Sequence, residues 1–172
     1  MSVFFTADNH FGHANIIDYC DRPFSSVEEM DQTMLDHWNF LVRPEDTVIH
    51  LGDFAFGNIE KVRRYLSQVS GKIILILGNH DRRVKAFHDW GIEVRKHAVL
   101  PLPGGKRVFL QHRPVTDKEQ WRRSSFQLCG HIHQKQHFDP KIINVGVDVW
   151  NFAPVACEII LGVALDDEIV LE

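Results

Sequence analysis

Residues 79–81 combine an amide, an imidazole and a carboxylate directly after an apolar stretch of the chain. Residues 72–77 are mostly apolar and lead into Gly78. An uninterrupted apolar run that ends at a glycine predicts a strand buried on both faces. In open α/β sheets, ligands bind in the crevice outside the carboxyl ends of the strands. We therefore expect Asn79, His80 and Asp81 to lie at a ligand-binding edge of a sheet.

Four further apolar runs end in the same way, each followed by residues of the kind that bind metals. The runs cover residues 3–5, 47–51, 107–111 and 126–129, and the polar residues that follow them are Asp8 and His10, Asp53, His112, and His131 and His133. Where two of these residues are spaced by two, both side chains project the same way in an extended chain. With Asn79, the set contains two carboxylates, one amide and four imidazoles. Such a set suits divalent metals such as zinc, manganese, iron or cobalt.

Each of these pieces has an ordinary structural explanation when it is taken alone. An aspartate after a strand is commonly a turn residue, a histidine there is commonly a surface residue, and Gly-Asn-His-Asp is compatible with an Asn/Asp turn. Five such pieces in one chain are harder to explain separately, because each follows an apolar run. The sequence therefore favours one metal-binding edge over five unrelated turns.

Taken in chain order, the same residues resemble a known family. The motifs are Asp8-x-His10, Gly52-Asp53, Gly78-Asn79-His80-Asp81, His112 and Gly130-His131-x-His133. They resemble the calcineurin-like metallophosphoesterase superfamily, and the flanking sequences look like its small, cap-less bacterial and phage members. The resemblance implies an α/β fold with two packed mixed β-sheets flanked by helices. Two positions depart from the commonest pattern, because Asn9 stands where Thr or Ser is usual and Arg113-Pro114 follows His112.

The resemblance also implies a role for each member of the set. Two divalent metal ions are expected per chain, drawn from Mn, Fe, Zn, Co and Ni, with Mn the expected choice in vitro. By position, the first ion would be held by Asp8, His10, Asp53 and His133, and the second by Asp53, Asn79, His112 and His131, with Asp53 bridging. A hydroxide that bridges the metals would attack phosphorus. His80 would be the catalytic imidazole that assists the leaving group.

Three more residues are candidates for catalysis or substrate binding. Asp81 is expected either to orient His80 as a carboxylate partner or to form a local turn bond, and both interpretations stay open. His13 follows the first metal motif closely enough to reach a substrate phosphate, although it is equally typical of the start of a short helix. Arg113 is adjacent to His112, and it is the cation that we expect to bind an anionic substrate.

Length, composition and charge set the broad class of the protein. At 172 residues the chain is expected to form one domain, residues 1–172, with a sizeable core. A net charge of -4 argues against strong general binding to nucleic acid. Three cysteines without metal-type spacing, and no signal peptide, indicate reduced thiols and a cytoplasmic location. No apolar run approaches the ~20 residues of a membrane span, so no membrane partner is expected, and the oligomeric state stays open.

The elements between the motifs follow from apolar spacing and turn residues. Ser26 begins an apparent capping box before an amphipathic helix, and apolar residues from 59 to 69 predict a crossover helix. Residues 103–105 predict a hairpin, after which the chain changes from strand–helix units to consecutive strands. A second capping box is expected at residues 116–119, and one more strand at 142–146. Residues 155–171 fit a helix in their first part and alternate like a strand at their end, so either is open.

The expected chemistry is metal-dependent hydrolysis of a phosphoester substrate. A site without an inserted cap should be open and shallow, which favours small or nucleotide-derived phosphodiesters over phosphomonoesters. The alternative class is a metal-binding scaffold that presents its surface to a protein partner and catalyses nothing. His80 distinguishes the two, because a scaffold has no need of an imidazole that binds no metal. Its presence favours the hydrolase.

Overall fold

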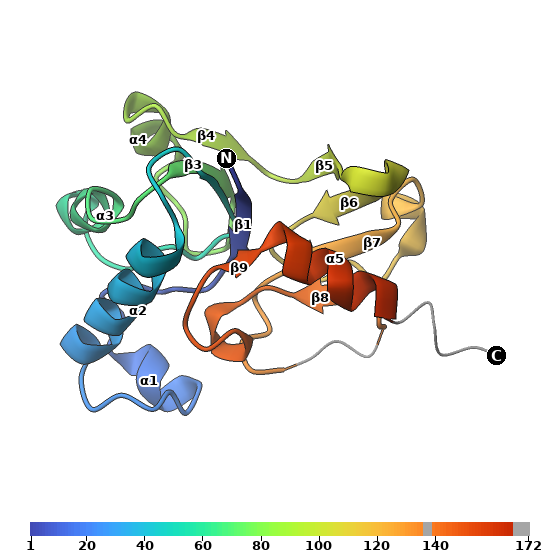
Figure 1. Cartoon of the computed structure of the whole chain (residues 1–172). Helices are drawn as coiled ribbons and strands as arrows, with labels where there is room; N and C mark the ends of the chain where they lie inside the picture. The colour runs from blue at the N-terminus through green and yellow to red at the C-terminus, as the bar shows by residue number, and fades with distance from the viewer. Residues whose placement is uncertain (136–138, 167–172) are drawn as a thin grey trace.

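Two β-sheets lie side by side, with helices on the outside, in a computed structural model that describes residues 1–135 and 139–166 (Figure 1). The first sheet has the strand order β4-β3-β2-β1-β9, with β1 to β4 parallel and β9 antiparallel to β1. The second has the order β5-β6-β7-β8, with β5 antiparallel to β6 and the remaining neighbours parallel. This confirms the predicted α/β arrangement of two mixed sheets.

The bounds of the elements are as follows. The strands are β1 (Val3–Thr6), β2 (Thr47–His50), β3 (Lys72–Ile76), β4 (Glu93–Arg95), β5 (Ala98–Pro101), β6 (Arg107–Leu110), β7 (Phe126–Cys129), β8 (Ile142–Asn144) and β9 (Val155–Ala156). The helices are α1 (Asn15–Tyr19), α2 (Val27–Leu41), α3 (Ile59–Leu66), α4 (Val84–Asp89) and α5 (Cys157–Asp166), with short 3₁₀ helices η1 (Pro103–Gly105), η2 (Lys118–Trp121) and η3 (Val147–Val149).

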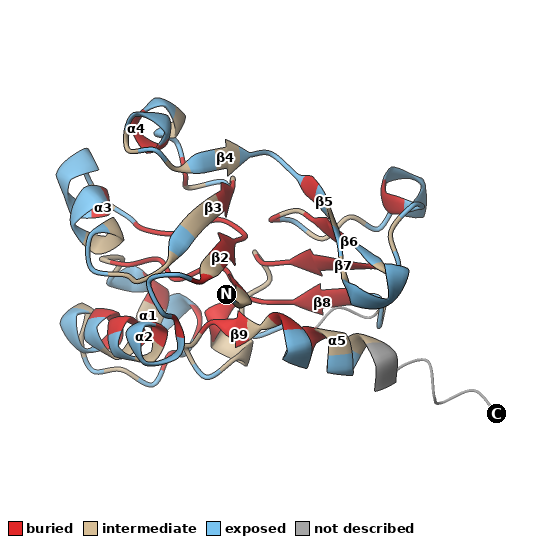
Figure 2. Cartoon of the chain, turned by 45° about the horizontal axis from the view of Figure 1, so that its top comes forward, coloured by how far each residue is buried: buried red, intermediate tan, exposed pale blue. Residues whose placement is uncertain are grey.

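The central strands are buried on both faces, which explains their continuous apolar sequences. In β1, Phe4 packs toward helices α2 and α3, whereas Phe5 packs into the core between the two sheets. In β2, Val48 likewise packs in the core beneath the helices, and Ile49 packs in the core between the sheets. Figure 2 shows the buried residues concentrated in the strands, while the helices are exposed on their outer sides. The sheets are therefore held rigidly between apolar layers, and their carboxyl ends are fixed in space.

The predicted helices are present, with small differences at their ends. Ser26 caps α2 by accepting a hydrogen bond from the Glu29 amide at 3.1 Å. The Glu29 carboxylate completes the box on the Ser25 amide rather than on that of Ser26. The capping box predicted at residues 116–119 is wrong in its cap residue, because Asp117, not Thr116, caps η2 through the Glu119 amide.

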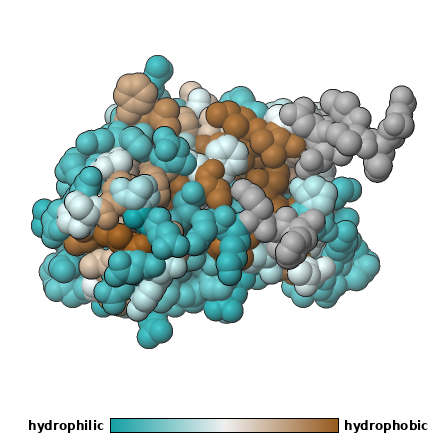
Figure 3. Space-filling view, turned by 90° about the horizontal axis from the view of Figure 1, so that it is seen from below, coloured by the Kyte–Doolittle hydropathy of each residue, from teal (hydrophilic) through white to brown (hydrophobic). Residues whose placement is uncertain are grey.

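The C-terminal segment begins with a two-residue strand before the helix. β9 pairs with β1, and α5 follows immediately from Cys157. The helical interpretation is thus confirmed for residues 157–166, whereas the alternating residues 168–171 lie outside the described residues. No helix in the described part of the chain is long and apolar enough to cross a bilayer. Much of the surface seen in Figure 3 is hydrophilic, with apolar side chains gathered in part of that face.

Candidate metal centre

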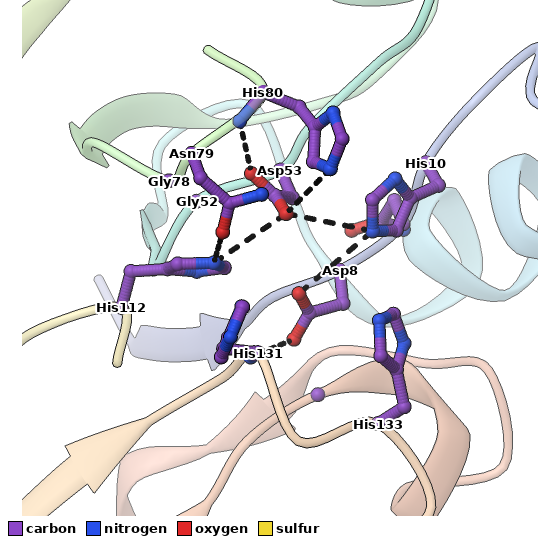
Figure 4. Close-up of polar contacts among 12 residues, drawn as sticks. Asp8, His10, Gly52, Asp53, Gly78, Asn79, His80, His112, His131 and His133 are labelled. Atoms are coloured by element: carbon purple, nitrogen blue, oxygen red, sulfur yellow. Dashed lines mark hydrogen bonds and ion pairs between the residues drawn. The ribbon is translucent and has the colours of Figure 1, made fainter. Parts of the chain in front are cut away.

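All seven predicted metal ligands follow strands that end at the same edge of the molecule. The first sheet supplies residues after β1, β2 and β3, and the second supplies residues after β6 and β7. A parallel bridge between Ala7 and Gly146 joins the ends of the two sheets. Because the sheets meet at this edge, ligands separated by more than 100 residues come within contact distance (Figure 4).

The backbone at the site is unusual, because five of the seven predicted ligands have positive φ angles. These are Asp8 (59°), His10 (52°), Asp53 (58°), His131 (70°) and His133 (49°). The left-handed region costs a non-glycine residue about 1–3 kcal/mol, and such strain clusters at functional sites. The residue pairs spaced by two therefore reach the centre through tight loops. The extended geometry that the sequence suggested for them is wrong.

The Asp53 carboxylate lies at the middle of the site. Its Oδ2 atom is 3.6 Å from His10 Nε2 and 3.4 Å from His112 Nε2, and it is 4.0 Å from His80 Nε2. Figure 4 shows these three imidazoles directed at the one carboxylate from different strand ends. Its Oδ1 atom accepts a hydrogen bond from the backbone N–H of His80 at 2.8 Å.

Six of the seven predicted ligands fall into two groups of donor atoms, and Asp53 belongs to only one of them. One group contains Asp8, His10 and His133, and the other contains Asp53, His112 and His131, with the ligand atoms of each group within 4.8 Å of one another. The remaining predicted ligand, Asn79, places Oδ1 3.1 Å from His112 Nε2 and so borders the second group.

Two buried atoms of the first group lack hydrogen-bond partners among the described residues. Asp8 Oδ1 and His10 Nε2 are both inaccessible to solvent, and neither atom has a hydrogen-bond partner among the described residues. A buried polar atom without a partner is costly, so such atoms need an explanation. A divalent cation coordinated by both atoms removes this cost. Carboxylate oxygen and imidazole nitrogen are donors that Mn, Fe, Co and Zn accept, so the residues fit a divalent metal.

Burial and neighbouring charges shift the pKa values of the site residues in different directions. Burial raises the pKa of Asp8 to about 6 and lowers the pKa of His10 to about 2. Burial also disfavours the charged form of Asp53, but the hydrogen bond and charge of His112 outweigh it and hold the pKa of this carboxyl well below its usual range. An ionised carboxylate beside a neutral His10 imidazole is the protonation state that metal binding requires.

Close backbone approach at the site requires glycine at two positions. A Cβ atom at Gly78 would collide with Asp53 Oδ1 and lie 2.5 Å from the Asp53 amide nitrogen. A Cβ atom at Gly130 would lie 2.5 Å from Asp8 Oδ2. The glycines that precede Asn79 and His131 in the motifs thus allow the loops to contact the two central carboxylates.

Two imidazoles of the predicted ligand set are oriented by partners that the sequence did not reveal. His112 contacts the Leu51 carbonyl oxygen through Nδ1 at 2.7 Å, and His133 contacts Asp148 Oδ2 through Nδ1 at 3.2 Å. Burial lowers the pKa of His133, but its contacts with Asp148 and Cys20 and the nearby Asp8 charge outweigh this effect and raise it to about 10. Contacts of this kind orient the ring and leave Nε2 as the nitrogen that would bind a metal ion.

Asp148 also pairs with Arg22, a second residue that the sequence did not single out. The guanidinium donates from Nε to Oδ1 at 2.8 Å and from Nη2 to Oδ2 at 3.0 Å. The same side chain donates to the carbonyl oxygens of Asp8 and Asn9 at 2.7 and 3.0 Å. Arg22 and Asp148 therefore tie the loop after β1 to η3. They are 126 residues apart, so no local pattern could have paired them.

The Asp81 carboxylate holds the loops rather than the His80 ring. It accepts hydrogen bonds from the amides of Asp53 (2.7 Å), Gly78 (2.9 Å) and Phe54 (3.2 Å). Of the two interpretations left open for Asp81, the structure shows the turn bond. His80 itself is 37% exposed at its side chain and lies on the solvent side of Asp53.

The two predicted substrate-binding residues border the centre. The His13 ring is 5.6 Å from the His10 ring and stacks on Phe56 at 4.4 Å. Arg113 is exposed, and its charge contributes, after burial and His112, to a lowered pKa of His131. Asn9 faces the core instead, because its Oδ1 atom contacts His50 Nε2 at 2.9 Å. The departure from Thr or Ser at this position therefore does not face the substrate side.

A two-sheet α/β sandwich with clustered Asp, Asn and His donors at its carboxyl edge defines a metal-dependent hydrolase. Residues 1–152 match the calcineurin-like phosphoesterase superfamily domain. The chain belongs to this superfamily, and it is a metal-dependent phosphoesterase.

Relatives with similar sequences cover nearly the whole chain. The uncharacterized protein MJ1445 of Methanocaldococcus jannaschii is 34% identical over 92% of this chain and 89% of its own length. The Gene 66 protein of Mycobacterium phage D29 is 29% identical over 87% of this chain and 89% of its own length.

Two solved structures share the fold. A protein of unknown function from Aquifex aeolicus, AQ665, superposes with a TM-score of 0.78 at 24% identity, covering 94% of this chain and 98% of that one. An archaeal phosphodiesterase superposes with a TM-score of 0.50 at 15% identity, covering 85% of this chain and 82% of that one. At these identities the likeness concerns the fold.

Proposed function

We propose that the chain is a two-metal phosphodiesterase that acts on small or nucleotide-derived substrates. The observation that carries the proposal is the placement of Asp53. Its Oδ2 atom lies within 3.6 Å of imidazole nitrogens from both donor groups, His10 in one and His112 in the other. A carboxylate in this position is suited to bridge two ions, with Mn, Fe, Zn, Co and Ni all compatible with the donors and Mn the expected choice in vitro.

In this proposal, each protein residue has a distinct role around the substrate phosphate. When bound, two divalent ions polarise phosphoryl oxygens and lower the pKa of the attacking water. The His80 Nε2 atom lies 4.0 Å from Asp53 Oδ2, and the side chain is 37% exposed, so the imidazole can reach the departing oxygen and donate a proton to it. Asp81 keeps the His80 loop against the Asp53 loop through three backbone hydrogen bonds. His13 and Arg113 are proposed to contact the substrate from the rim.

An open site supports the choice of diesters. His80 and Arg113 are accessible to solvent, so the second substituent of a diester can extend outward without displacing a buried element. A phosphomonoester has one more ionisable oxygen and leaves this outward space unfilled. The proposal therefore concerns substrate class and metal number within a superfamily of phosphoesterases.

The test is a substrate and metal panel on the whole chain. After chelation, the protein is reloaded separately with Mn²⁺, Fe²⁺, Zn²⁺, Co²⁺ and Ni²⁺ and assayed on bis(4-nitrophenyl) phosphate and 4-nitrophenyl phosphate. We expect a higher kcat/KM for the diester. Asp53→Asn should abolish turnover of both esters, whereas Asp36→Asn, an exposed carboxylate on α2, should not. A higher kcat/KM for the monoester would contradict the diester assignment, and no hydrolysis with any metal would contradict the catalytic function.

A further inference from the structure

A pocket opens directly beside the candidate metal centre. Its volume is about 520 Å³, which is within the range of small-molecule sites. The lining residues are Ala55, Phe56, Gly57, His80, Arg82 and Arg83. The His80 side chain is shared by the pocket and the centre, because its Nε2 atom lies 4.0 Å from Asp53 Oδ2. A substrate whose phosphorus lies at Asp53 can therefore extend past His80 into this pocket.

Among the described residues that line the pocket are two arginines and no carboxylate. Arg82 and Arg83 are exposed, and among the described residues neither guanidinium has an ion pair or hydrogen-bond partner. Nearby cations differ in this respect, since Lys85 pairs with Asp89 and Arg95 pairs with Glu93. Guanidinium groups that are free of carboxylates can bind phosphate oxygens through two hydrogen bonds each.

The pocket is also lined by an exposed aromatic ring, that of Phe56. Phe56 is 45% exposed, although the His13 ring stacks on it with an interplanar angle of 24°. The edge of the His80 ring approaches it at 6.3 Å between centroids. An aromatic ring supported in this way offers a stacking platform for a base, and stacking on such rings is worth ~1–3 kcal/mol per base.

We propose that this pocket recognises a nucleotide portion of the substrate, with a second phosphate on Arg82 and Arg83 and the base on Phe56. The inference rests on the proposed phosphoesterase function and names its substrate class as a mononucleotide unit that carries a phosphate besides the one at the metal centre. The two arginines are suited to an anion beyond the scissile phosphate. The exposed Phe56 ring is suited to a flat aromatic group such as a base. A nucleoside bisphosphate supplies both within the length of the pocket.

Binding is tested by calorimetry on the metal-loaded protein with a ladder of adenosine, adenosine 5′-monophosphate, adenosine 3′,5′-bisphosphate and ribose 5-phosphate. The bisphosphate should bind about tenfold more tightly than the monophosphate, as expected for one additional charged contact. Arg82→Gln and Arg83→Gln should each reduce this ratio, and the double variant should bring it close to one. Phe56→Ala should remove the advantage of the monophosphate over ribose 5-phosphate and leave the bisphosphate ratio in place.

Arg123→Gln is the matched control, since Arg123 is an exposed arginine before β7, at the opposite edge of the second sheet from the centre. It should leave every ratio unchanged. A ratio that is one in the unmutated protein, or that survives the double variant, would overturn the proposal. So would a 5′-phosphorylated decanucleotide that binds more than tenfold more tightly than the bisphosphate, because the ligand would then be a strand. Calorimetry needs no turnover, so failure of the phosphodiesterase assay and failure of this pocket assignment are seen separately.

Discussion

Asp53 is the residue on which the candidate centre depends most directly. One carboxylate oxygen faces the imidazoles of His10, His80 and His112, while the other is held by the His80 amide. The amide nitrogen of Asp53 is in turn held by Asp81. With both its oxygens and its backbone in use, the side chain has little freedom to reorient. A substitution here should therefore affect both donor groups at once.

The first prediction concerns metal content. Asp53→Asn keeps the side-chain volume but removes the negative charge, so the binding of both ions should weaken. His133→Ala removes a donor from one group only and should leave the other ion in place. Elemental analysis after dialysis should give close to two ions for the unmutated chain, near zero for Asp53→Asn and close to one for His133→Ala. One tightly bound ion that is unaffected by Asp53→Asn would disprove the bridging role.

The second prediction concerns His80, which is not needed as a ligand. His80→Ala should retain metal and fold but lower kcat by the ~10²–10⁴ that a lost acid–base group typically costs. The loss should be smaller for a 4-nitrophenyl leaving group than for an alkyl or nucleoside one, because nitrophenolate needs little protonation.

The control for His80 is His88→Ala, an exposed histidine on α4 that should have no effect on either substrate. Loss of metal from His80→Ala would instead make the imidazole a ligand. Equal effects on good and poor leaving groups would argue that His80 contributes charge or position and not a proton.

At the scale of elements, Arg22 and Asp148 join three segments that the sequence keeps far apart. Arg22 follows α1 and reaches the loop after β1, while Asp148 belongs to η3 beyond β8. Both side chains are almost completely buried, with exposed fractions of 0% and 3%. The pair also holds His133 through its contact with Asp148, so the elements that carry the first donor group are positioned together.

The third prediction follows from this buried pair. Asp148→Ala leaves the Arg22 charge buried without its partner, and removal of one member of a buried pair typically costs ~3–5 kcal/mol. Lost orientation of His133 should also weaken metal binding about 10–100-fold. Chemical denaturation and metal titration measure the two effects. Asp36→Ala, at an exposed position, should change neither, and wild-type values for Asp148→Ala would show that the pair is not needed.

The elements, and the residues that gather at the site, were predictable where their signals are local. An apolar run followed by Asp or His describes a strand and its carboxyl end within about ten residues, as at Asp53 and His112. The partners of these residues were not predictable, because Arg22 and Asp148 meet only through the folded topology. The two-residue strand β9 was not predicted for another reason. Its pairing with β1 depends on tertiary contact rather than on an alternating sequence.

The backbone conformation of the site also could not be predicted from local sequence patterns. The sequence suggested extended geometry for residues spaced by two, whereas Asp8, His10, His131 and His133 adopt left-handed conformations. Such conformations are disfavoured for non-glycine residues and are maintained only by the surrounding structure. Hydrogen bonds such as that from the His131 amide to Asp8 Oδ2 at 2.8 Å supply this support. Which residues gather at the site was therefore easier to predict than the path of the chain between them.

At the scale of the whole molecule, each donor group takes residues from both sheets. Asp8 and His10 come from the first sheet and His133 from the second, while Asp53 comes from the first and His112 and His131 come from the second. The apolar core between the sheets holds them together away from this edge. A bound ion therefore forms a further connection between the sheets, and metal binding should stabilise the entire fold.

The last prediction is that divalent metal raises the thermal stability of the chain through this connection. An ion present at 100 times its Kd stabilises the native state by about 2.7 kcal/mol, which corresponds to a Tm increase of about 5–10 °C for a chain of this size. Thermal unfolding is followed by circular dichroism after chelation and again with added Mn²⁺ or Zn²⁺. Asp36→Asn should show the same increase as the unmutated chain, whereas Asp53→Asn should lose most of it because both donor groups are weakened. If Asp53→Asn responded to metal as fully as the unmutated chain, the stabilising ion would lie elsewhere, and the two-sheet connection at Asp53 would have to be abandoned.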